Sequence, residues 1–512
     1  MKKIKELIGF NGLCCLIAAF VFITICSKSS FLYPINDWGD VNCYFIIGKG
    51  ILKGLVPYKD LYDQKGIVVF FVFALANIIS STSFIGVYIL EVICCFFFLY
   101  FTLKISDLFC NAQRWALPIC FIVAGSVYSS ASICHGGSVE ELCLPFFSYG
   151  LYLCIRQIVN NKIPSGLEMF IFGIFAGMMF FSKFTLCIFY IVLIVVMIVD
   201  AVRNKYLVLL LKKAMFFILG CIVVSTVVLS YLVCTNSLYE FYIAYVYNSI
   251  FNYKPSDVDV TWLFRISTFF RKRNILDIIL IGLSFFYLIR EKKILLLICH
   301  GFVFISIFYI QFGIGYPHKY YGIPLYALEA VGLCIIVELF EKIKLKKKGV
   351  FSSAVAILMI VLAVVFTNNK YMLFQKKEDT RQYILAEKMN QYGYDDYHML
   401  SYNNLDDGYY FASGKFPNFR AFIQSNVSSD TIVNEQNDII NAGNVEFIVT
   451  KKILCDANDY DKALSKYGKE SEKNIVTFKD FKYELVDETK EFYEDEYFLV
   501  KLYKIKDSMQ NH

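Results

Sequence analysis

The chain has 512 residues, of which 57% are hydrophobic and 18% aromatic, and its mean hydropathy is +0.53. A single soluble core of this size does not hide that much apolar surface from water, so the composition excludes a soluble globular protein and predicts a polytopic membrane protein. The net charge of +6 is small, and the Lys and Arg residues gather in short clusters between apolar segments, which indicates topology signals and excludes a nucleic-acid-binding surface.

The N-terminal residues 1–26 combine a basic start with a long apolar run and lack a small-x-small cleavage site. We therefore expect a retained first span rather than a cleaved signal peptide. Most of the 17 cysteines, such as Cys94 and Cys95, lie inside apolar segments. This placement favours small core residues over a disulfide framework.

Membrane-spanning helices are predicted from the length of the apolar segments, because crossing the hydrocarbon core takes about 20 apolar residues. The candidate spans are 8–27, 84–103, 115–133, 141–158, 167–182, 184–201, 214–234, 274–290, 294–312, 320–340 and 350–367. The predicted fold class is therefore a polytopic α-helical membrane protein with about eleven transmembrane helices.

A further apolar segment, 67–79, is short, and its placement decides the orientation of everything that follows. If it crosses the membrane, the basic clusters at 290–293 and 342–348 lie outside the cell. If it lies along the interface, these clusters join the N-terminal lysines in the cytoplasm, which the positive-inside rule favours. We therefore predict an interfacial helix at 67–79, a cytoplasmic N-terminus and polar loops that gather on the extracytoplasmic side.

Two regions follow from this pattern: a multi-span domain at 1–367, whose first outer loop is 28–83, and an extracytoplasmic domain at 368–512. The apolar periodicity of the spans ends near residue 368. The segments "VEFIVTKKIL" and "EYFLVKLYKIK" in the second region have the composition of short strands. We expect a small α/β domain there.

The motif Asp40-x-x-x-Tyr44, followed by "GKGILKGLVPYKDLYDQKG", resembles the first extracytoplasmic loop of the GT-C membrane glycosyltransferases, in particular glycosyltransferase family 39 and the aminoarabinose-transferase-like group. The resemblance extends to "SVEELCLPFFSYGLYL" at 138–153, "GMMFFSKFTLCIFY" at 177–190 and "YPHKYYGIPLYALEA" at 316–330. It implies a GT-C-like fold and an inverting enzyme. Such an enzyme moves a sugar from a polyprenyl-phosphate donor in the membrane to a lipid, protein or cell-wall polymer acceptor outside the cytoplasmic membrane.

Sugar transfer needs a base that takes the proton of the acceptor, and carboxylates are the candidates. Asp40 matches the catalytic aspartate that the resemblance implies, with Asp37 as its rival and Glu141 as a further candidate. The alternative for Asp40 is that it caps a helix that starts near Val41, because Asp is a favoured N-cap residue.

The departing phosphate needs cations that hold its developing charge. The candidate phosphate-binding residues are Lys65, Lys183, Arg265, Arg271, His318 and Lys319. Lys183 interrupts an apolar stretch near the outer boundary, where it binds either a lipid-linked sugar phosphate or ordinary phospholipid headgroups. Arg265 and Arg271 lie outside in the favoured orientation, so either they bind an anionic lipid carrier or the span boundary differs there. The alternative for His318 is a structural role as a hydrogen-bonded residue that does not bind phosphate.

Residues that support the site or contact the acceptor are expected around these two groups: Tyr44, Tyr58, Asp60, Asp63, Glu140 and Tyr320. The alternative for the charged ones is that they stay solvated at the membrane interface. No cofactor is implied. The five histidines are scattered and show no metal-ligand spacing, although a divalent cation held by Asp40 and Glu141 stays open because oxygen-only sites leave little sequence trace.

Two other functional classes use the same features. A lipid or glycan flippase or transporter would place charged residues along a transport path. A membrane-tethered envelope scaffold would use 368–512 as its functional part. Against a transporter, the sequence shows no repeat symmetry between its halves, and the predicted charges gather at one face of the membrane.

Overall fold

The computed structural model describes residues 9–252, 261–271, 273–313, 317–342, 348–394, 396–425, 429–456, 483–493 and 496–506. The chain divides into two compact units. The helical unit comprises Met1–Asn36, Gly66–Cys234 and Lys254–Gln375, and the sheet unit comprises Asp37–Lys65, Thr235–Tyr253 and Lys376–His512. Residues 37–65 of the predicted first outer loop therefore group with the C-terminal part of the chain.

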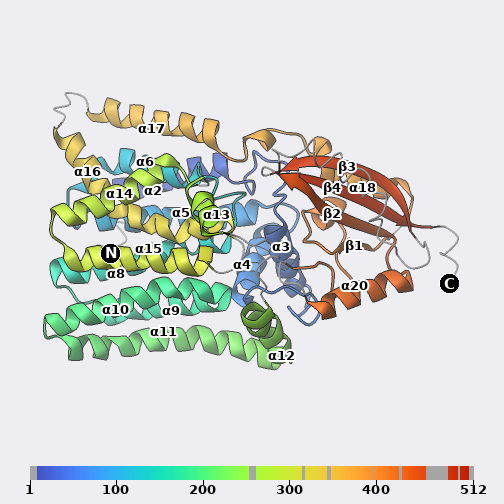
Figure 1. The fold of residues 1–512 in the computed structure, drawn as a ribbon, viewed down its shortest axis with the longest axis horizontal. Coiled ribbons are helices and arrows are strands. Elements are labelled where there is room, and N and C mark those ends of the chain that lie inside the picture. Colours follow the sequence, from blue (N-terminus) through green and yellow to red (C-terminus); the bar gives the residue numbers. More distant parts are fainter. Residues whose placement is uncertain are drawn as a thin grey trace. The chain divides into compact units, whose positions relative to one another are not determined.

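The helical unit consists mainly of apolar helices (Figure 1). Its helices are α2 (Phe10–Cys26), α4 (Ile67–Ile79), α5 (Ile85–Ser106), α6 (Ala116–Tyr128), α7 (Val139–Leu142), α8 (Leu144–Asn160), α9 (Gly166–Lys183), α10 (Cys187–Arg203), α11 (Leu207–Cys234), α13 (Trp262–Arg271), α14 (Ile275–Arg290), α15 (Ile294–Ile307), α16 (Glu329–Lys342) and α17 (Lys348–Phe366). Each candidate span from the sequence overlaps one of these helices, in some cases together with an adjoining helical segment, although α6 is shorter and α11 longer than predicted.

Six helical stretches among the described residues are long and apolar enough to cross a membrane. The chain is therefore a multi-pass membrane protein. The short apolar segment is a separate helix, α4, with the predicted bounds. The total of about eleven spans and the orientation of the chain stay predictions.

Helices α9 and α11 lie side by side and approach closely through two glycines (Figure 1). A Cβ atom on Gly173 would lie 1.9 Å from the carbonyl oxygen of Phe217, and one on Gly220 would lie 2.2 Å from the carbonyl oxygen of Phe170. Small residues at such positions let membrane helices pack backbone against backbone. Van der Waals contacts then stabilise the pair, because lipid tails are as apolar as the helices and the hydrophobic effect does not drive their association.

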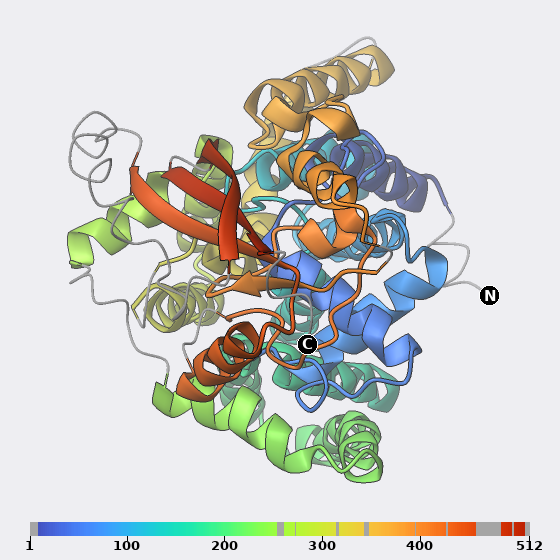
Figure 2. The same cartoon turned by 90° about the vertical axis from the view of Figure 1, so that its right-hand side faces the viewer.

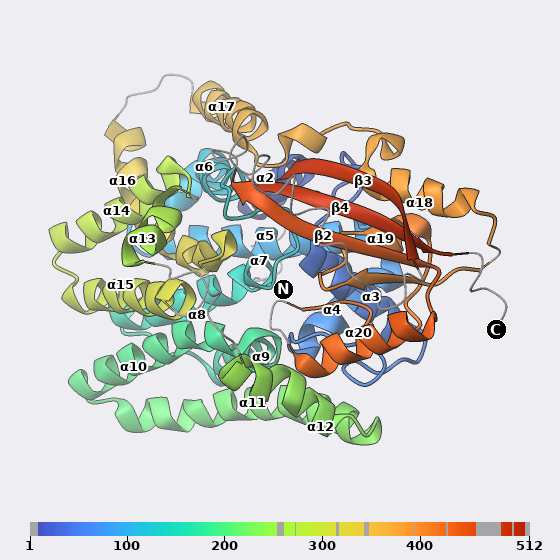
Figure 3. The ribbon, with the colours of Figure 1, turned by 45° about the vertical axis from the view of Figure 1, so that its right-hand side comes forward.

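The sheet unit contains four strands, β1 (Met399–Tyr402), β2 (Phe447–Asp456), β3 (Tyr483–Tyr493) and β4 (Glu496–Ile505). Their order is β1-β2-β4-β3; β1 pairs parallel to β2, and the other two pairs are antiparallel (Figures 2 and 3). Its helices are α3 (Gly39–Leu52), α12 (Leu238–Phe241), the π-helix η3 (Tyr242–Asn252), α18 (Arg381–Gln391), α19 (Tyr409–Ser413) and α20 (Asp430–Ala442). The two strands predicted from sequence, β2 and β4, are confirmed.

The sheet buries an apolar face against α20. Leu400, Ile448 and Tyr503 from three strands pack with Ile440 of α20, and all four side chains are buried. Successive strand residues point to opposite faces, so these alternating apolar positions form one core layer.

Replacing Gly173 by Ala is expected to destabilise the protein, because the added methyl group collides with the backbone of α11 and overpacking of this kind costs about 1–3 kcal/mol. The melting temperature of the purified protein in detergent measures the effect. Gly282→Ala in α14 is the matched control, since no atom lies within 4 Å of its added Cβ, and it is expected to leave stability unchanged or slightly raised. Equal melting temperatures for the two variants would contradict the packing argument.

Candidate functional site

The first candidate group lies at the start of α3 in the sheet unit. The helix begins at Gly39, and the side chain of Trp38 at its N-cap position makes no capping hydrogen bond. Asp40 therefore occupies the first turn, where a negative charge is favourable beside the helix N-terminus. The alternative interpretation of Asp40 as the capping residue is wrong, because the helix starts earlier than the sequence indicated. The rival Asp37 is buried just before the helix.

Three predicted residues meet in this unit. The ammonium group of Lys65 lies 3.7 Å from Oδ2 of Asp40. Asp63 is 3% exposed, and its Oδ1 accepts hydrogen bonds from the backbone N–H groups of Gln64 and Lys65, at 2.5 and 3.3 Å. Burial raises the pKa of Asp63 to about 7; Lys65 opposes this shift, and Asp40 adds to it. Two carboxyl groups thus share one lysine, and Asp63 changes charge near neutral pH.

The other predicted residues of this loop hold its shape. Tyr58 has a φ of +68°, which is uncommon for a residue with a side chain, and its hydroxyl donates to the carbonyl oxygen of Lys65 at 2.7 Å. Asp60 Oδ2 accepts from the N–H group of Val56 at 2.7 Å and so closes a turn. Tyr44 is buried in α3. These contacts fix the path of the chain that carries Asp63 and Lys65.

Sequence reasoning missed the partners that clamp this loop from distant segments. The backbone N–H of Tyr62 donates to the carbonyl oxygen of Arg420 at 3.0 Å, and the Arg420 guanidinium lies 5.4 Å from the Tyr62 ring. Asn248, in the π-helix η3, donates to the Tyr62 hydroxyl at 3.2 Å. π-helical turns are often found at functional sites, but an isolated sequence shows neither the turn nor its target.

The second candidate group lies in the helical unit around Lys183. Helix α9 ends there, and a 3-10 turn, Phe184–Leu186, separates it from α10, as the sequence predicted. Lys183 Nζ donates to Oε1 of Glu140 at 2.5 Å and lies 4.0 Å from the centre of the Tyr321 ring. A carboxylate and an aromatic face together compensate an ammonium group next to an apolar environment.

Two more predicted residues belong to this second group. Lys183 Nζ lies 5.7 Å from the ring centre of Tyr320, and the His318 ring stacks on Tyr320 with 5.4 Å between centres. Lys319 opens the 3-10 helix η5 (Lys319–Leu328) that follows. Glu140, Lys183, His318 and Tyr320 are thus brought together as a cluster of charged and aromatic side chains.

Glu141 points into a different environment from that of its neighbour. It is fully buried, its Oε2 accepts from the N–H of Gly137 at 2.9 Å, and its own N–H donates to Ser138 at 3.0 Å. The sequence interpretation missed Glu91, a buried carboxyl inside α5 that accepts hydrogen bonds from the Ser27 hydroxyl at 2.9 Å. The signal that could have identified Glu91 is a single Glu inside an apolar span.

The glycine pair of "CHGGSVEE" has a steric reason. Gly136 has a φ of +90°, and a Cβ atom there would lie 2.1 Å from Ser27 Oγ and 2.5 Å from Glu91 Oε1. Only glycine fits this conformation and this approach.

The predicted arginines are placed differently. Arg265 is buried, and its Nη1 donates to the carbonyl oxygen of Phe312 at 2.5 Å. The side chain of Arg271 lies outside the described part of the structure. The nearby Arg273 forms a buried bidentate ion pair with Asp277, a partner that sequence reasoning missed. Because a buried charge needs compensation, Arg273 is a structural residue of the loop between α13 and α14.

Among the residues that the structure describes, no group of three or more His, Cys, Asp or Glu side chains could hold a metal ion. Asp40 belongs to the sheet unit and Glu141 to the helical unit. A cation shared by these two carboxylates stays an untested expectation.

Apolar helices long enough to cross a membrane, together with a small mixed sheet, define the class of the fold as a multi-pass helical membrane protein with an additional sheet unit. No family model matches the chain, and no curated protein matches it significantly. Among solved structures, it is similar to ArnT from Cupriavidus metallidurans in the apo state, with a TM-score of 0.57 and 10% identity over 98% of each chain. It is also similar to ArnT from the same organism bound to undecaprenyl phosphate, with a TM-score of 0.56 and 10% identity over 97% of this chain and 98% of that one. The resemblance to the aminoarabinose-transferase-like group is thereby confirmed at the level of the fold.

The raised pKa of Asp63 predicts a pH-dependent stability. Between pH of about 4 and 7, the folded state keeps a proton that the unfolded state, with its ordinary pKa of 3.8, releases, so wild-type stability falls as the pH rises through this window. Asp63→Asn removes this contribution. The difference in melting temperature, variant minus wild type, is therefore expected to increase from pH 5 to pH 8.

Asp396→Asn is the control for this measurement. Lys415 holds the pKa of this exposed carboxyl below its ordinary value, so it stays ionised across the window. Its melting-temperature difference from wild type is expected to stay constant. If the Asp63→Asn difference were also constant, Asp63 would be ionised throughout and the assignment would be wrong.

Proposed function

We propose that the protein is an integral membrane glycosyltransferase that moves a sugar from a polyprenyl-phosphate donor to an acceptor on the extracytoplasmic face. The observation that carries the proposal is the group of Asp40, Asp63 and Lys65 in the loop that resembles the catalytic loop of the GT-C enzymes. The ArnT-like fold supports it, because one of the similar structures is bound to undecaprenyl phosphate.

In the proposed reaction, Asp40 is the general base. It takes the proton of an acceptor hydroxyl as the acceptor oxygen forms a bond to C1 of the sugar, while the bond from C1 to the phosphate oxygen breaks. The electron pair leaves with the polyprenyl phosphate, and the sugar inverts its configuration in one displacement. Lys65, 3.7 Å from Asp40, balances the charge of the carboxylate before the proton arrives.

The proposed contact for the lipid phosphate is Lys183. Glu140 accepts a hydrogen bond from its ammonium group, and two tyrosine rings lie against it. The hydrogen bond to Glu140 orients the Lys183 ammonium group. Charge-assisted hydrogen bonds to phosphate are stronger than neutral ones, and this gives Lys183 an energetic role in donor binding.

The first test is sugar transfer by the purified, reconstituted protein from a panel of polyprenyl-phosphate and polyprenyl-diphosphate sugars. Asp40→Asn keeps the size of the side chain and removes the base, so turnover is expected to fall by about 10²- to 10⁴-fold. Asp396→Asn, which changes an exposed carboxylate of the same unit, is expected to retain wild-type turnover. An unchanged rate for Asp40→Asn would indicate that the base is Asp37 or Glu141 instead. No transfer from any donor by the wild type would favour a transporter or a scaffold.

The second test measures the affinity of the reconstituted protein for undecaprenyl phosphate. Lys183→Met is expected to weaken binding by roughly 10- to 100-fold, because hydrogen bonds to charged groups contribute about 1.5–3 kcal/mol. Lys162→Met, an exposed lysine between α8 and α9, is the matched control and is expected to bind normally. Since Lys183→Met leaves Glu140 unpaired, the double variant with Glu140→Gln separates loss of folding from loss of binding. Wild-type affinity in the double variant would exclude Lys183 as a phosphate contact.

A further inference from the structure

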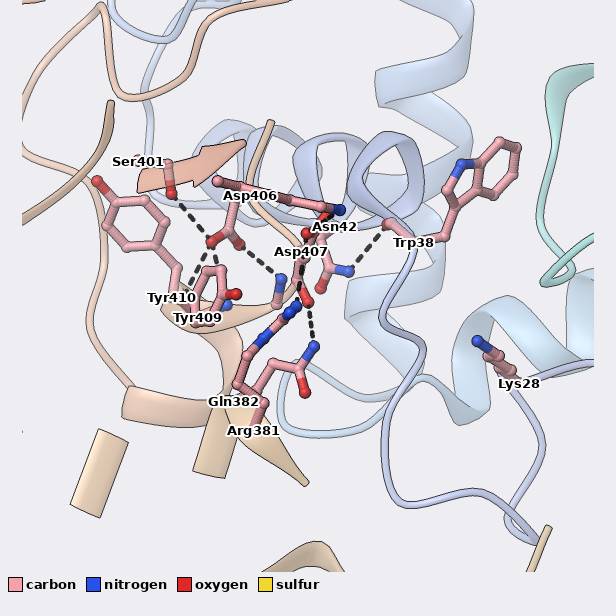
Figure 4. Close-up of polar contacts among 12 residues, drawn as sticks. Lys28, Trp38, Asn42, Arg381, Gln382, Ser401, Asp406, Asp407, Tyr409 and Tyr410 are labelled. Carbon is pink, nitrogen blue, oxygen red and sulfur yellow. Dashed lines mark hydrogen bonds and ion pairs between the residues drawn. The ribbon is translucent and has the colours of Figure 1, made fainter. Parts of the chain in front are cut away.

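A loop of the sheet unit, residues 403–408 between β1 and α19, is built around a buried carboxyl group. Asp406 Oδ1 accepts from the Ser401 hydroxyl at 3.3 Å and from the N–H groups of Tyr409 and Tyr410 at 3.0 and 3.4 Å, and Oδ2 accepts from the N–H of Gly408 at 3.2 Å (Figure 4). These bonds satisfy the donors at the start of α19 and fix the loop to that helix.

The next residue anchors the same loop to two other elements. The Asp407 carboxylate lies 2.6 Å from Nζ of Lys451 on β2 and 3.6 Å from a guanidinium nitrogen of Arg381 on α18. The carbonyl oxygen of Asp407 accepts from the side chain of Gln382 at 3.0 Å (Figure 4). Asp407 is almost fully buried, so the loss of both cations would leave an uncompensated charge. The loop is therefore held rigidly from three sides.

This loop packs closely against Gly39, the residue that precedes Asp40. A Cβ atom on Gly39 would lie 2.8 Å from Cβ of Leu405 and 3.1 Å from Oδ1 of Asp407. Further along α3, the buried Cys43 side chain lies near Asp406. The start of α3 is thus seated on the loop by direct contact.

A second contact lies further along the same helix. The Phe45 ring of α3 packs edge to face on Phe411 of α19, with 5.7 Å between centres. The side chain of Asp40, by contrast, has a Lys65 partner at 3.7 Å, beyond ordinary hydrogen-bond distance. Because this partner does not fix the Asp40 carboxylate by a hydrogen bond, the direction of the side chain depends on the position of the α3 backbone at the start of the helix.

We infer that residues Leu405–Asp407 are a positioning element for Asp40, which set the geometry of the proposed base through their contact with Gly39. The inference rests on the proposed function. A base works only within a narrow range of positions, and a displacement of about 1 Å costs roughly 10²-fold in rate. The loop contacts Gly39, the residue next to Asp40, and takes no part in the chemistry.

A compensating pair of substitutions tests the inference. Gly39→Ala is expected to lower kcat for sugar transfer at least tenfold with a donor KM within twofold of wild type, because the new methyl group moves the start of α3 off the loop. Leu405→Gly removes the side chain that this methyl group meets. The double variant Gly39→Ala/Leu405→Gly is therefore expected to recover most of the lost kcat, although Leu405→Gly alone does not exceed wild type. Wild-type kcat in Gly39→Ala, or no recovery in the double variant, would overturn the inference.

A spectroscopic signal separates this inference from the proposed function. The chain has three tryptophans, and Trp38 stands at the N-cap of α3. In protein labelled with 5-fluorotryptophan, the ¹⁹F resonance of Trp38, assigned with Trp38→Phe, is expected to shift in Gly39→Ala and to return in the double variant. If the wild type transfers no sugar while this signal moves and returns, the proposed function fails and the contact stands. If the resonance does not respond, the contact itself is refuted.

Discussion

A charged group beside an apolar environment must have a compensating partner, and this requirement organises the polar groups of the molecule. Lys183 is held by Glu140 and two tyrosine rings, Arg273 by Asp277, and Lys65 by Asp40. Each cation has its partner within reach because leaving it alone would cost several kcal/mol. The candidate groups are thus also necessary to the stability of their surroundings.

Much of the fold followed from composition, because long apolar helices have a strong local signal. Helix α4 has its predicted bounds, the break at Lys183 is present, and β2 and β4 lie in the predicted segments. The short strand β1 and the polar strand β3 were missed. Neither has an apolar run of its own, so their strand structure depends on pairing with neighbours far away in the chain.

The candidate groups were predicted in part for the same reason. Most of the charged residues were identified from the motifs of the loops, and Lys183 because it interrupts apolar sequence. The structure brings Asp63 and Lys65 to Asp40, and Glu140 to Lys183. Their partners from distant segments, such as Arg420 and Asn248, show no local pattern. The loop at residues 403–408 could not be predicted for the same reason, since its contact with Gly39 joins residues more than three hundred positions apart.

The grouping of residues 37–65 with the C-terminal part of the chain has a consequence for biosynthesis. The residues that hold the start of α3 are Leu405 and Asp407, and the strand that anchors them carries Lys451. A ribosome makes α3 long before any of these residues exist, so the segment waits without its partners while most of the helical unit is inserted. Its final geometry is reached only when translation has passed β2. A nascent chain that stops in the last spans therefore carries the candidate base but lacks the residues that orient it.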